Sequence, residues 1–362
     1  MDPRIRNHAE IVVDHCLDVQ PGDRVLVDAK PAVEEFVVAL YEELGKRDAI
    51  PMRIGASPRA SRAYLREFDP DAAALKEHKL AALEAADKLV MAWGMANTRE
   101  TSDVPDEVSN ALGEANQPIM EAHLDMPWVG TMHPLPGNAQ AAEMSTDAYE
   151  AFVYDAIDKD WDAQRAFQQQ LVDILDPADE VRIVSGDRTD ITLSVAGMDA
   201  GNDDAKRNLP GGEAYTVPVP DGVEGEVLFD LPVVTRGEEL ENVWLRFEDG
   251  EVVEFEAESG EDTLESILER DDGSHRLGEL GIGMNRDIDR LTNHMLFDEK
   301  MGDTVHLALG RCLDEVVPEG MSGNESSLHV DMLVDMSEDS FIAVDGEVVQ
   351  RDGTFRFEDG FE

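Results

Sequence analysis

The chain contains only two cysteines, Cys16 and Cys312. Two thiols are too few for a disulfide framework or for a zinc site built from cysteine. No stretch approaches the roughly 18 consecutive apolar residues of a membrane-spanning helix. The first residues, Met-Asp-Pro-Arg-Ile-Arg-Asn-His, include no apolar segment of the kind found in secretion signals. We therefore expect a soluble protein of the cytoplasm.

Positive charge is also scarce. The 362 residues include 30 lysines and arginines, only eight of them lysine, against 80 aspartates and glutamates, which gives a formal net charge of −50. Such a surface repels nucleic acids and anionic membranes, and no basic patch indicates a polyphosphate site. The acids spread along the whole chain and 42% of residues are hydrophobic, so a folded core is favoured over a disordered acidic tail. The composition is typical of a halophilic protein.

This charge predicts that folding depends on salt. Carboxylates repel one another over a Debye length of roughly 10 Å at 0.1 M ionic strength, but over only about 3 Å at 1 M. The melting temperature should therefore rise in thermal melts from about 0.1 to about 3 M KCl. A melting temperature that does not change with KCl would contradict the halophilic interpretation.

The length predicts two domains, because single cores rarely exceed about 250–300 residues. In the first half, helical spacing near 3–19, 31–46 and 70–87 alternates with apolar runs at 24–28, 51–54 and 88–93. This rhythm indicates a parallel α/β layer. A helical pattern over 147–174 ends at Asp176-Pro177.

Beyond that point, short strands broken by Asp-Gly and Pro-Gly turns are expected at 181–184, 189–195, 226–229, 243–247 and 252–255. We therefore expect an α/β domain over 1–176 and a β-rich α+β catalytic domain over 177–362.

Several catalytic motifs are absent. The sequence has no His-Glu-x-x-His and no Walker loop, and Gly281-x-Gly283-x-x-Arg286 lacks the third glycine of a dinucleotide fingerprint. Gly320-Met-Ser322-Gly-Asn is not a nucleophile elbow, which needs glycines two residues either side of the serine. The remaining signal is a series of acids and histidines in apolar runs of the second half, which is typical of a divalent-metal site.

The His-x-Asp pair at 329 and 331 is the most specific part of this series. Apolar residues at 328, 330, 332 and 334 alternate with it, so in a strand both side chains project from one face, roughly 7 Å apart. From that spacing, imidazole and carboxylate can share one ion or hold two neighbouring ones. Neither group is easily buried without such a partner.

Four further candidate ligands each have a simpler structural interpretation. Glu213 follows Pro-Gly-Gly, where a solvated turn carboxylate would be ordinary. Glu279 shares a strand face with two glycines that leave room for close approach. Glu299 lies in a charged Asp-Glu-Lys turn, where solvated surface is the usual case. His306 has Thr304 and Ala308 on its strand face, where a hydrogen-bonded core histidine would be ordinary.

The segments around these candidates occur in a characteristic order: Asn208-Leu-Pro-Gly-Gly-Glu213-Ala-Tyr-Thr-Val-Pro, Gly278-Glu279-Leu-Gly-Ile-Gly, Phe297-Asp-Glu299-Lys, Thr304-Val-His306-Leu-Ala-Leu-Gly310 and Leu328-His329-Val-Asp331. This series resembles the thermophilic metallo-aminopeptidase family of the aminopeptidase T and S type. The resemblance implies a homodimer whose sites face an internal cavity, and a pair of divalent ions bridged by a carboxylate and held by Glu213, Glu279, Glu299, His306, His329 and Asp331.

One position departs from this resemblance. The family has a tyrosine seven residues after the first site histidine, and here that position is Leu313. A related branch with the same fold opens dihydroxypyridine rings with mononuclear iron. The alternatives to an aminopeptidase are therefore a ring-cleaving dioxygenase of that type and a non-catalytic metal-binding protein. The acids at 213, 279 and 299 count against the dioxygenase, which needs only a few ligands with open positions.

The chemistry of the candidates suits peptide hydrolysis. A metal pair lowers the pKa of bound water, polarises the scissile carbonyl and anchors a free α-amine, so we expect peptide substrates with a free amino terminus. Glu279 or Glu299 is the candidate catalytic base, which would pass the proton of the attacking water to the leaving amine. Ligands of Glu, Asp and His without thiolate suit Zn²⁺, Mn²⁺ or Co²⁺ and do not choose among them.

Overall fold

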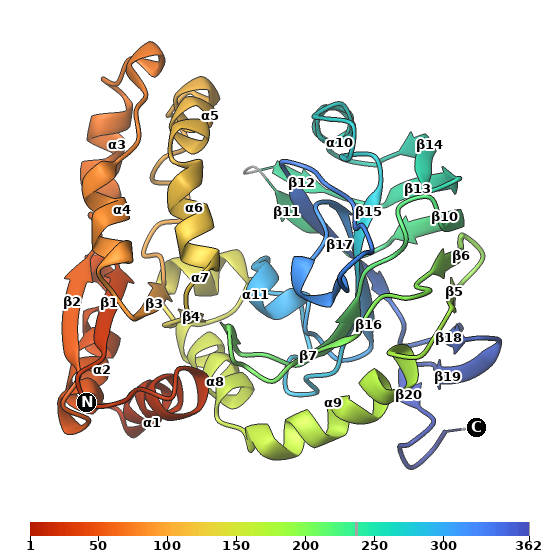
Figure 1. Ribbon diagram of the computed structural model, residues 1–362, viewed down its shortest axis with the longest axis horizontal. Coiled ribbons are helices and arrows are strands. Elements are labelled where there is room, and N and C mark those ends of the chain that lie inside the picture. Colours follow the sequence, from red (N-terminus) through yellow and green to blue (C-terminus); the bar gives the residue numbers. More distant parts are fainter. Residues whose placement is uncertain (236–237, 362) are drawn as a thin grey trace. The chain divides into compact units, whose positions relative to one another are not determined.

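The computed structural model describes residues 1–235 and 238–361 (Figure 1). This part of the chain forms two compact units. The first comprises Met1–Lys159 and Ala205–Gly211, and the second comprises Asp160–Asp204 and the residues from Gly212 onward. No helix in the described ranges is both long and apolar enough to cross a membrane.

The first unit is built on a sheet with strand order β2-β1-β3-β4-β8, in which all neighbouring strands are parallel. Its strands are β1 (Arg24–Ala29), β2 (Ile50–Ile54), β3 (Lys88–Trp93), β4 (Trp128–Met132) and β8 (Asn208–Leu209). The predicted parallel α/β layer is thus confirmed. Strand β4 had no clear signal in the sequence because it contains Gly130. A Cβ atom there would lie 2.4 Å from the Trp93 ring, so the glycine makes room for that indole.

The helices of this unit are α1 (Pro3–Ile11), α2 (Glu34–Lys46), α3 (Pro58–Leu65), α4 (Glu77–Glu84), α5 (Asp106–Ala115), α6 (Gln117–Leu124), α7 (Pro136–Ala141) and α8 (Thr146–Ile157). Shorter turns lie at Val12–Cys16, Pro31–Val33 and Pro70–Ala72. The helix expected near 70–87 is correct only for α4. Asp69 caps a separate 3₁₀ turn that begins at Pro70, and Ala73 has extended backbone, so the two helical segments do not join.

A buried histidine connects α1 to the sheet. His8 is 1% exposed, and its Nε2 lies 2.7 Å from the Thr131 hydroxyl on β4. That hydroxyl donates to the backbone carbonyl of Leu209 at 2.9 Å. Burial, with a smaller contribution from nearby His133, lowers the pKa of His8 to about 3. The folded chain therefore holds this imidazole neutral.

His8 should make the protein sensitive to acid. Because its pKa is lower in the folded than in the unfolded chain, stability is complete above about pH 6.5 and falls as the pH drops toward the folded value. The loss at pH 5 should be on the order of 2 kcal/mol. Urea unfolding of the wild type and of His8→Gln at about pH 7.5 and about pH 5 tests this. The variant, which cannot titrate there, should lose less stability on acidification, and equal losses would contradict the assignment.

The second unit is β-rich, as predicted. An antiparallel sheet has the order β14-β13-β10-β6-β5-β18-β19-β20. Its strands are β5 (Glu180–Ser185), β6 (Thr189–Ser194), β10 (Val223–Phe229), β13 (Val243–Glu248), β14 (Glu251–Glu256), β18 (Ser340–Val344), β19 (Glu347–Arg351) and β20 (Thr354–Phe355). All five strands expected between 181 and 255 lie in this sheet.

A second antiparallel sheet has the order β17-β16-β15-β9-β7. Its strands are β7 (Gly201–Asp203), β9 (Glu213–Thr216), β15 (Leu277–Gly283), β16 (Thr304–Gly310) and β17 (His329–Asp335). A small ribbon pairs β11 (Val233–Thr235) with β12 (Glu238–Leu240). The other elements are α9 (Trp161–Leu175), α10 (Glu261–Leu268), α11 (Met295–Asp298) and a 3₁₀ turn at Asp314–Val316.

One face of the β17-to-β7 sheet supplies the core of this unit. Its alternate residues pack into one buried cluster with residues of the larger sheet: Leu280, Ile282, Met284, Val305, Leu307, Leu309, Val330, Met332 and Val334. These are the positions that period-two alternation assigned to the apolar faces of the three strands. The prediction of which face is buried in the core is confirmed, and the acids and histidines are left for the other face.

Helix α9 belongs to the second unit. The helical pattern over 147–174 is two helices, because the Asp160 side chain caps a new one by accepting from the Ala163 amide. Helix α9 packs against β7 and β9 of the second unit. The boundary between the compact units therefore lies before α9, at Lys159 and Asp160, rather than after it. The domain ranges 1–176 and 177–362 stay a prediction, because compactness alone does not establish an independently folding domain.

Candidate metal centre

The second face of the β17-to-β7 sheet gathers most of the predicted ligands. Glu279 on β15 lies opposite Ala308, which lies opposite Asp331 on β17. Glu213 on β9 lies opposite Gly283, which is four residues from Glu279 along β15 and on the same face. Directly opposed residues of antiparallel strands project from the same face. The register therefore brings together acids that are far apart in sequence.

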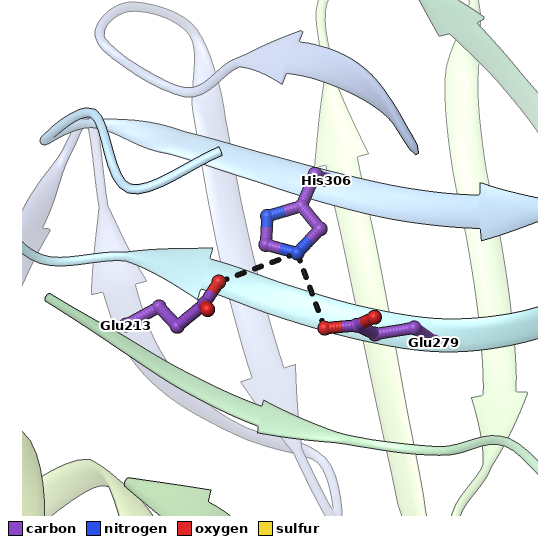
Figure 2. A group of neighbouring side chains, drawn as sticks. All are labelled: Glu213, Glu279 and His306. Carbon is purple, nitrogen blue, oxygen red and sulfur yellow. Dashed lines mark hydrogen bonds and ion pairs between the residues drawn. The ribbon is translucent and has the colours of Figure 1, made fainter. Parts of the chain in front are cut away.

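Two groups of side chains form on this face. In the first, the Nε2 atom of His306 lies 3.3 Å from Glu279 Oε1 and 3.4 Å from Glu213 Oε2, and Figure 2 shows the imidazole directed at both carboxylates. In the second, the Nε2 atom of His329 lies 3.2 Å from both Glu279 Oε2 and Asp331 Oδ1. Potential ligand atoms within each group lie within 4.8 Å of one another. Glu279 belongs to both groups and directs one oxygen into each.

Gly281 makes room for the first group. It lies opposite His306 in the sheet, and a Cβ atom at this position would lie 2.0 Å from the imidazole Cε1 and 2.1 Å from Nε2. Any side chain larger than hydrogen would displace the ring. The close approach expected from the glycines beside Glu279 is therefore present at Gly281.

The electrostatics of the groups follow from burial and from their opposite charges. Burial would raise the pKa of Glu279, but hydrogen bonds with His306 and His329 hold it below its ordinary value. Burial would also lower the pKa of both histidines, but the facing carboxylates raise it. The pKa of Asp331 is lowered despite burial, chiefly by His329. Glu279 and Asp331 thus share their charge with the two imidazoles, whereas burial raises the pKa of Glu213 to about 8 despite the nearby Lys300 and His306.

The arrangement also orients single ligand atoms. His329 directs Nδ1 toward the backbone carbonyl of Arg311 at 2.7 Å, which leaves Nε2 for the acids. Such contacts fix the tautomer of metal-bound histidines. Glu213 Oε2 is buried without a hydrogen bond to any described residue. Buried carboxylate oxygens and imidazoles without thiolate suit Zn²⁺, Mn²⁺ or Co²⁺, so these residues fit the predicted kind of ion.

Glu299 lies apart from both groups. Its carboxylate instead pairs with the ammonium of the adjacent Lys300. The Asp-Glu-Lys turn is not the solvated surface that its composition favours, because Asp298 and Lys300 are buried. The Lys300 ammonium also lies 3.0 Å from Glu213 Oε1 and 3.4 Å from Asp203 Oδ2. Glu299 is thus linked to Glu213 through a shared lysine.

Two supporting residues were missed at the sequence level. Lys300 lies in a charged turn of the sequence, and no periodic pattern marks it. Gln168 on α9 is fully buried, and its amide donates to the backbone carbonyls of Glu213 at 3.1 Å and Asp203 at 3.0 Å. The sequence pattern indicates the burial of Gln168, because Gln164 and Gln168 lie on the same helical face as Leu171 and Leu175.

Leu313 packs beside a small cluster formed by Met198, Val217, Cys312 and Val316.

The thermophilic metalloprotease (M29) family matches residues 1–355. The chain belongs to this family. The resemblance found in the sequence is thereby confirmed, and the M29 match extends it over the first half as well. Among curated relatives, aminopeptidase AmpS of Bacillus subtilis (strain 168) is 37% identical over 171 residues, which cover 41% of this chain and 40% of that protein. The match thus spans about two fifths of the relative's length.

Two solved structures share the fold of this M29 protein. Wild-type AmpT from Thermus thermophilus has a TM-score of 0.88 at 23% identity, covering 98% of this chain and 99% of that chain. The 2,5-dihydroxypyridine dioxygenase from Pseudomonas putida KT2440 has a TM-score of 0.64 at 15% identity, covering 98% and 97%. The predicted fold class, an α/β part followed by a β-rich α+β part, is confirmed.

Proposed function

We propose that this M29 protein is a metal-dependent aminopeptidase that releases amino-terminal residues from peptides. The position of Glu279 carries the proposal. Its two carboxylate oxygens face two different groups, one with Glu213 and His306 and the other with His329 and Asp331. A carboxylate shared in this way suits a pair of neighbouring divalent ions, with Zn²⁺, Co²⁺ or Mn²⁺ as the candidates.

Divalent ions held there would supply Lewis acidity toward the scissile carbonyl and a water acidified toward neutrality. The roles of the acids then follow from their contacts. Both oxygens of Glu279 already face imidazoles, whereas Glu299 lies outside both groups and is partly exposed. We therefore prefer Glu299 over Glu279 as the base that takes a proton from the attacking water and returns it to the leaving amine.

The proposal predicts a requirement for a free amino terminus. A site lined by carboxylates and cations binds an uncharged or protonated amine, and acetylation removes that group. Leucyl and alanyl anilides should be hydrolysed in high salt with added divalent metal, and their N-acetylated forms should be spared. The rate at which the aniline is released measures both. Equal cleavage of free and acetylated substrates would rule out an aminopeptidase.

The second candidate is a mononuclear iron dioxygenase, favoured by the fold shared with the dihydroxypyridine enzyme. Two groups of ligands around Glu279 count against it, because one iron needs only one of them. Oxygen uptake on a dihydroxypyridine, without any anilide hydrolysis, would establish this alternative. Metal binding without either activity would leave a non-catalytic metal-binding protein.

Several finer points belong to the same proposal. We propose that Glu213, Glu279, Glu299, His306, His329 and Asp331 form the functional centre. Two ions per chain, a homodimer, a halophilic character and a cytoplasmic location complete it. The site residues, the two ions and the homodimer stay predictions of the family resemblance, and metal analysis tests the ions. The halophilic character stays a prediction of the composition, which the salt-dependent melts test, and the location stays a prediction of the sequence.

A further inference from the structure

Lys300 lies in the second unit and is fully buried, with no exposed side-chain surface. Lysines are almost never fully buried unless they are paired. Here the ammonium contacts Asp203, Glu213 and Glu299, and these carboxylates raise its pKa despite burial. The residue follows α11, so neither a strand register nor a helical stripe places it there. Its burial needs another explanation.

The two oxygens of Glu213 have different surroundings. Oε1 accepts a hydrogen bond from Lys300 at 3.0 Å. Oε2 has no hydrogen bond to a described residue and lies 3.4 Å from His306 Nε2. The backbone carbonyl of Glu213 is held separately, by Gln168. The ammonium is therefore a hydrogen-bond donor to one oxygen of this carboxylate, and the imidazole of His306 lies near the other.

We infer that Lys300 is a positioning residue of the metal centre. Its ammonium holds Oε1 of Glu213 and thereby turns Oε2 toward the group formed with Glu279 and His306. The same ammonium also pairs with the carboxylate of Glu299. This inference rests on the proposed function, because it assigns Lys300 to a site that binds divalent ions. Partners that orient a ligand in this way typically change metal affinity or activity about 10- to 100-fold when they are removed.

A double variant tests the inference without leaving an excess of buried negative charge. Lys300→Met alone removes one positive charge from beside three acids, which can prevent folding. Asp203→Asn combined with Lys300→Met removes one charge of each sign, so the net charge of the cluster is unchanged. Asp203→Asn alone is the matched control, because it keeps the contact between Lys300 and Glu213. Thermal melts establish that each variant is folded.

The measurement is titration of the metal-free proteins with Zn²⁺ in competition with a chromogenic chelator. The wild type and Asp203→Asn should each bind two ions, and the affinity for each ion should be similar in the two proteins. The double variant should keep one ion, at Glu279, His329 and Asp331, and bind the other at least about tenfold more weakly. Excess Zn²⁺ should then restore binding of the second ion.

Three outcomes would overturn the inference. A folded double variant that binds both ions like the wild type would show that Lys300 does not orient Glu213. An equal loss of affinity for both ions would indicate that Lys300 has a general structural role. A wild type that binds no divalent ion would remove the proposed function and this inference together, whereas the first two outcomes leave the proposed function intact.

Discussion

Glu279→Gln and His329→Ala should each lower bound metal and turnover by orders of magnitude. Removing a ligand forfeits the Lewis acid and the activated water together. Glu279→Gln should affect both ions, because each carboxylate oxygen faces a different group. His329→Ala should affect chiefly the group that contains Asp331. The fold should persist in both variants, because the opposite face of these strands carries the apolar packing.

A core substitution on the same strand is the matched control. Val330 lies between His329 and Asp331, but its side chain is 8% exposed and packs in the apolar cluster. Val330→Ala should cost on the order of 1–3 kcal/mol in stability and leave the metal in place. Metal stoichiometry beside a melting curve for each variant separates the two effects. Should Glu279→Gln and His329→Ala retain full metal and activity, these residues are structural and the proposed centre is wrong.

Gly281→Ala should weaken metal binding without touching any proposed ligand. The added methyl group would meet the imidazole of His306 at about 2 Å, so the ring has to move away from Glu213 and Glu279. We expect metal affinity and turnover to fall about 10- to 100-fold, as for other changes that misorient a ligand. Chelator competition and anilide hydrolysis measure these quantities.

Gly45→Ala is the control for this substitution. Gly45 lies in α2, and a Cβ atom there meets nothing within 4 Å. Alanine is preferred over glycine in a helix by up to about 1 kcal/mol, so this variant should be as stable as the wild type or more so, with unchanged metal. If Gly281→Ala keeps the metal affinity and turnover of Gly45→Ala, metal binding does not depend on the observed position of the His306 imidazole.

The face on which the candidate ligands lie was predictable because alternation along a strand is local. In β15, β16 and β17, every second residue is apolar, and this alone assigned Glu279, His306 and Asp331 to the face away from the core. The strand-helix rhythm of the first unit is equally local. Its least predictable parts were α5, α6 and β4, where a polar surface or a glycine obscures the pattern.

The grouping of the ligands was not predictable from local pattern, because it depends on pairing between distant strands. Nothing near Glu213 indicates that it reaches His306 across β15. Composition even argued against the burial of Lys300, since three charged residues in a row are usually solvated. Only the resemblance to a known family joined these segments before the fold was known.

Metal analysis of the wild type beside Glu279→Gln tests the central claim most directly. Both proteins would be purified in high salt, dialysed against metal-free buffer and analysed for all divalent metals. The account predicts two ions of Zn²⁺, Co²⁺ or Mn²⁺ per chain in the wild type and the loss of both in the variant. A wild type that holds a single iron, or no metal, would contradict it.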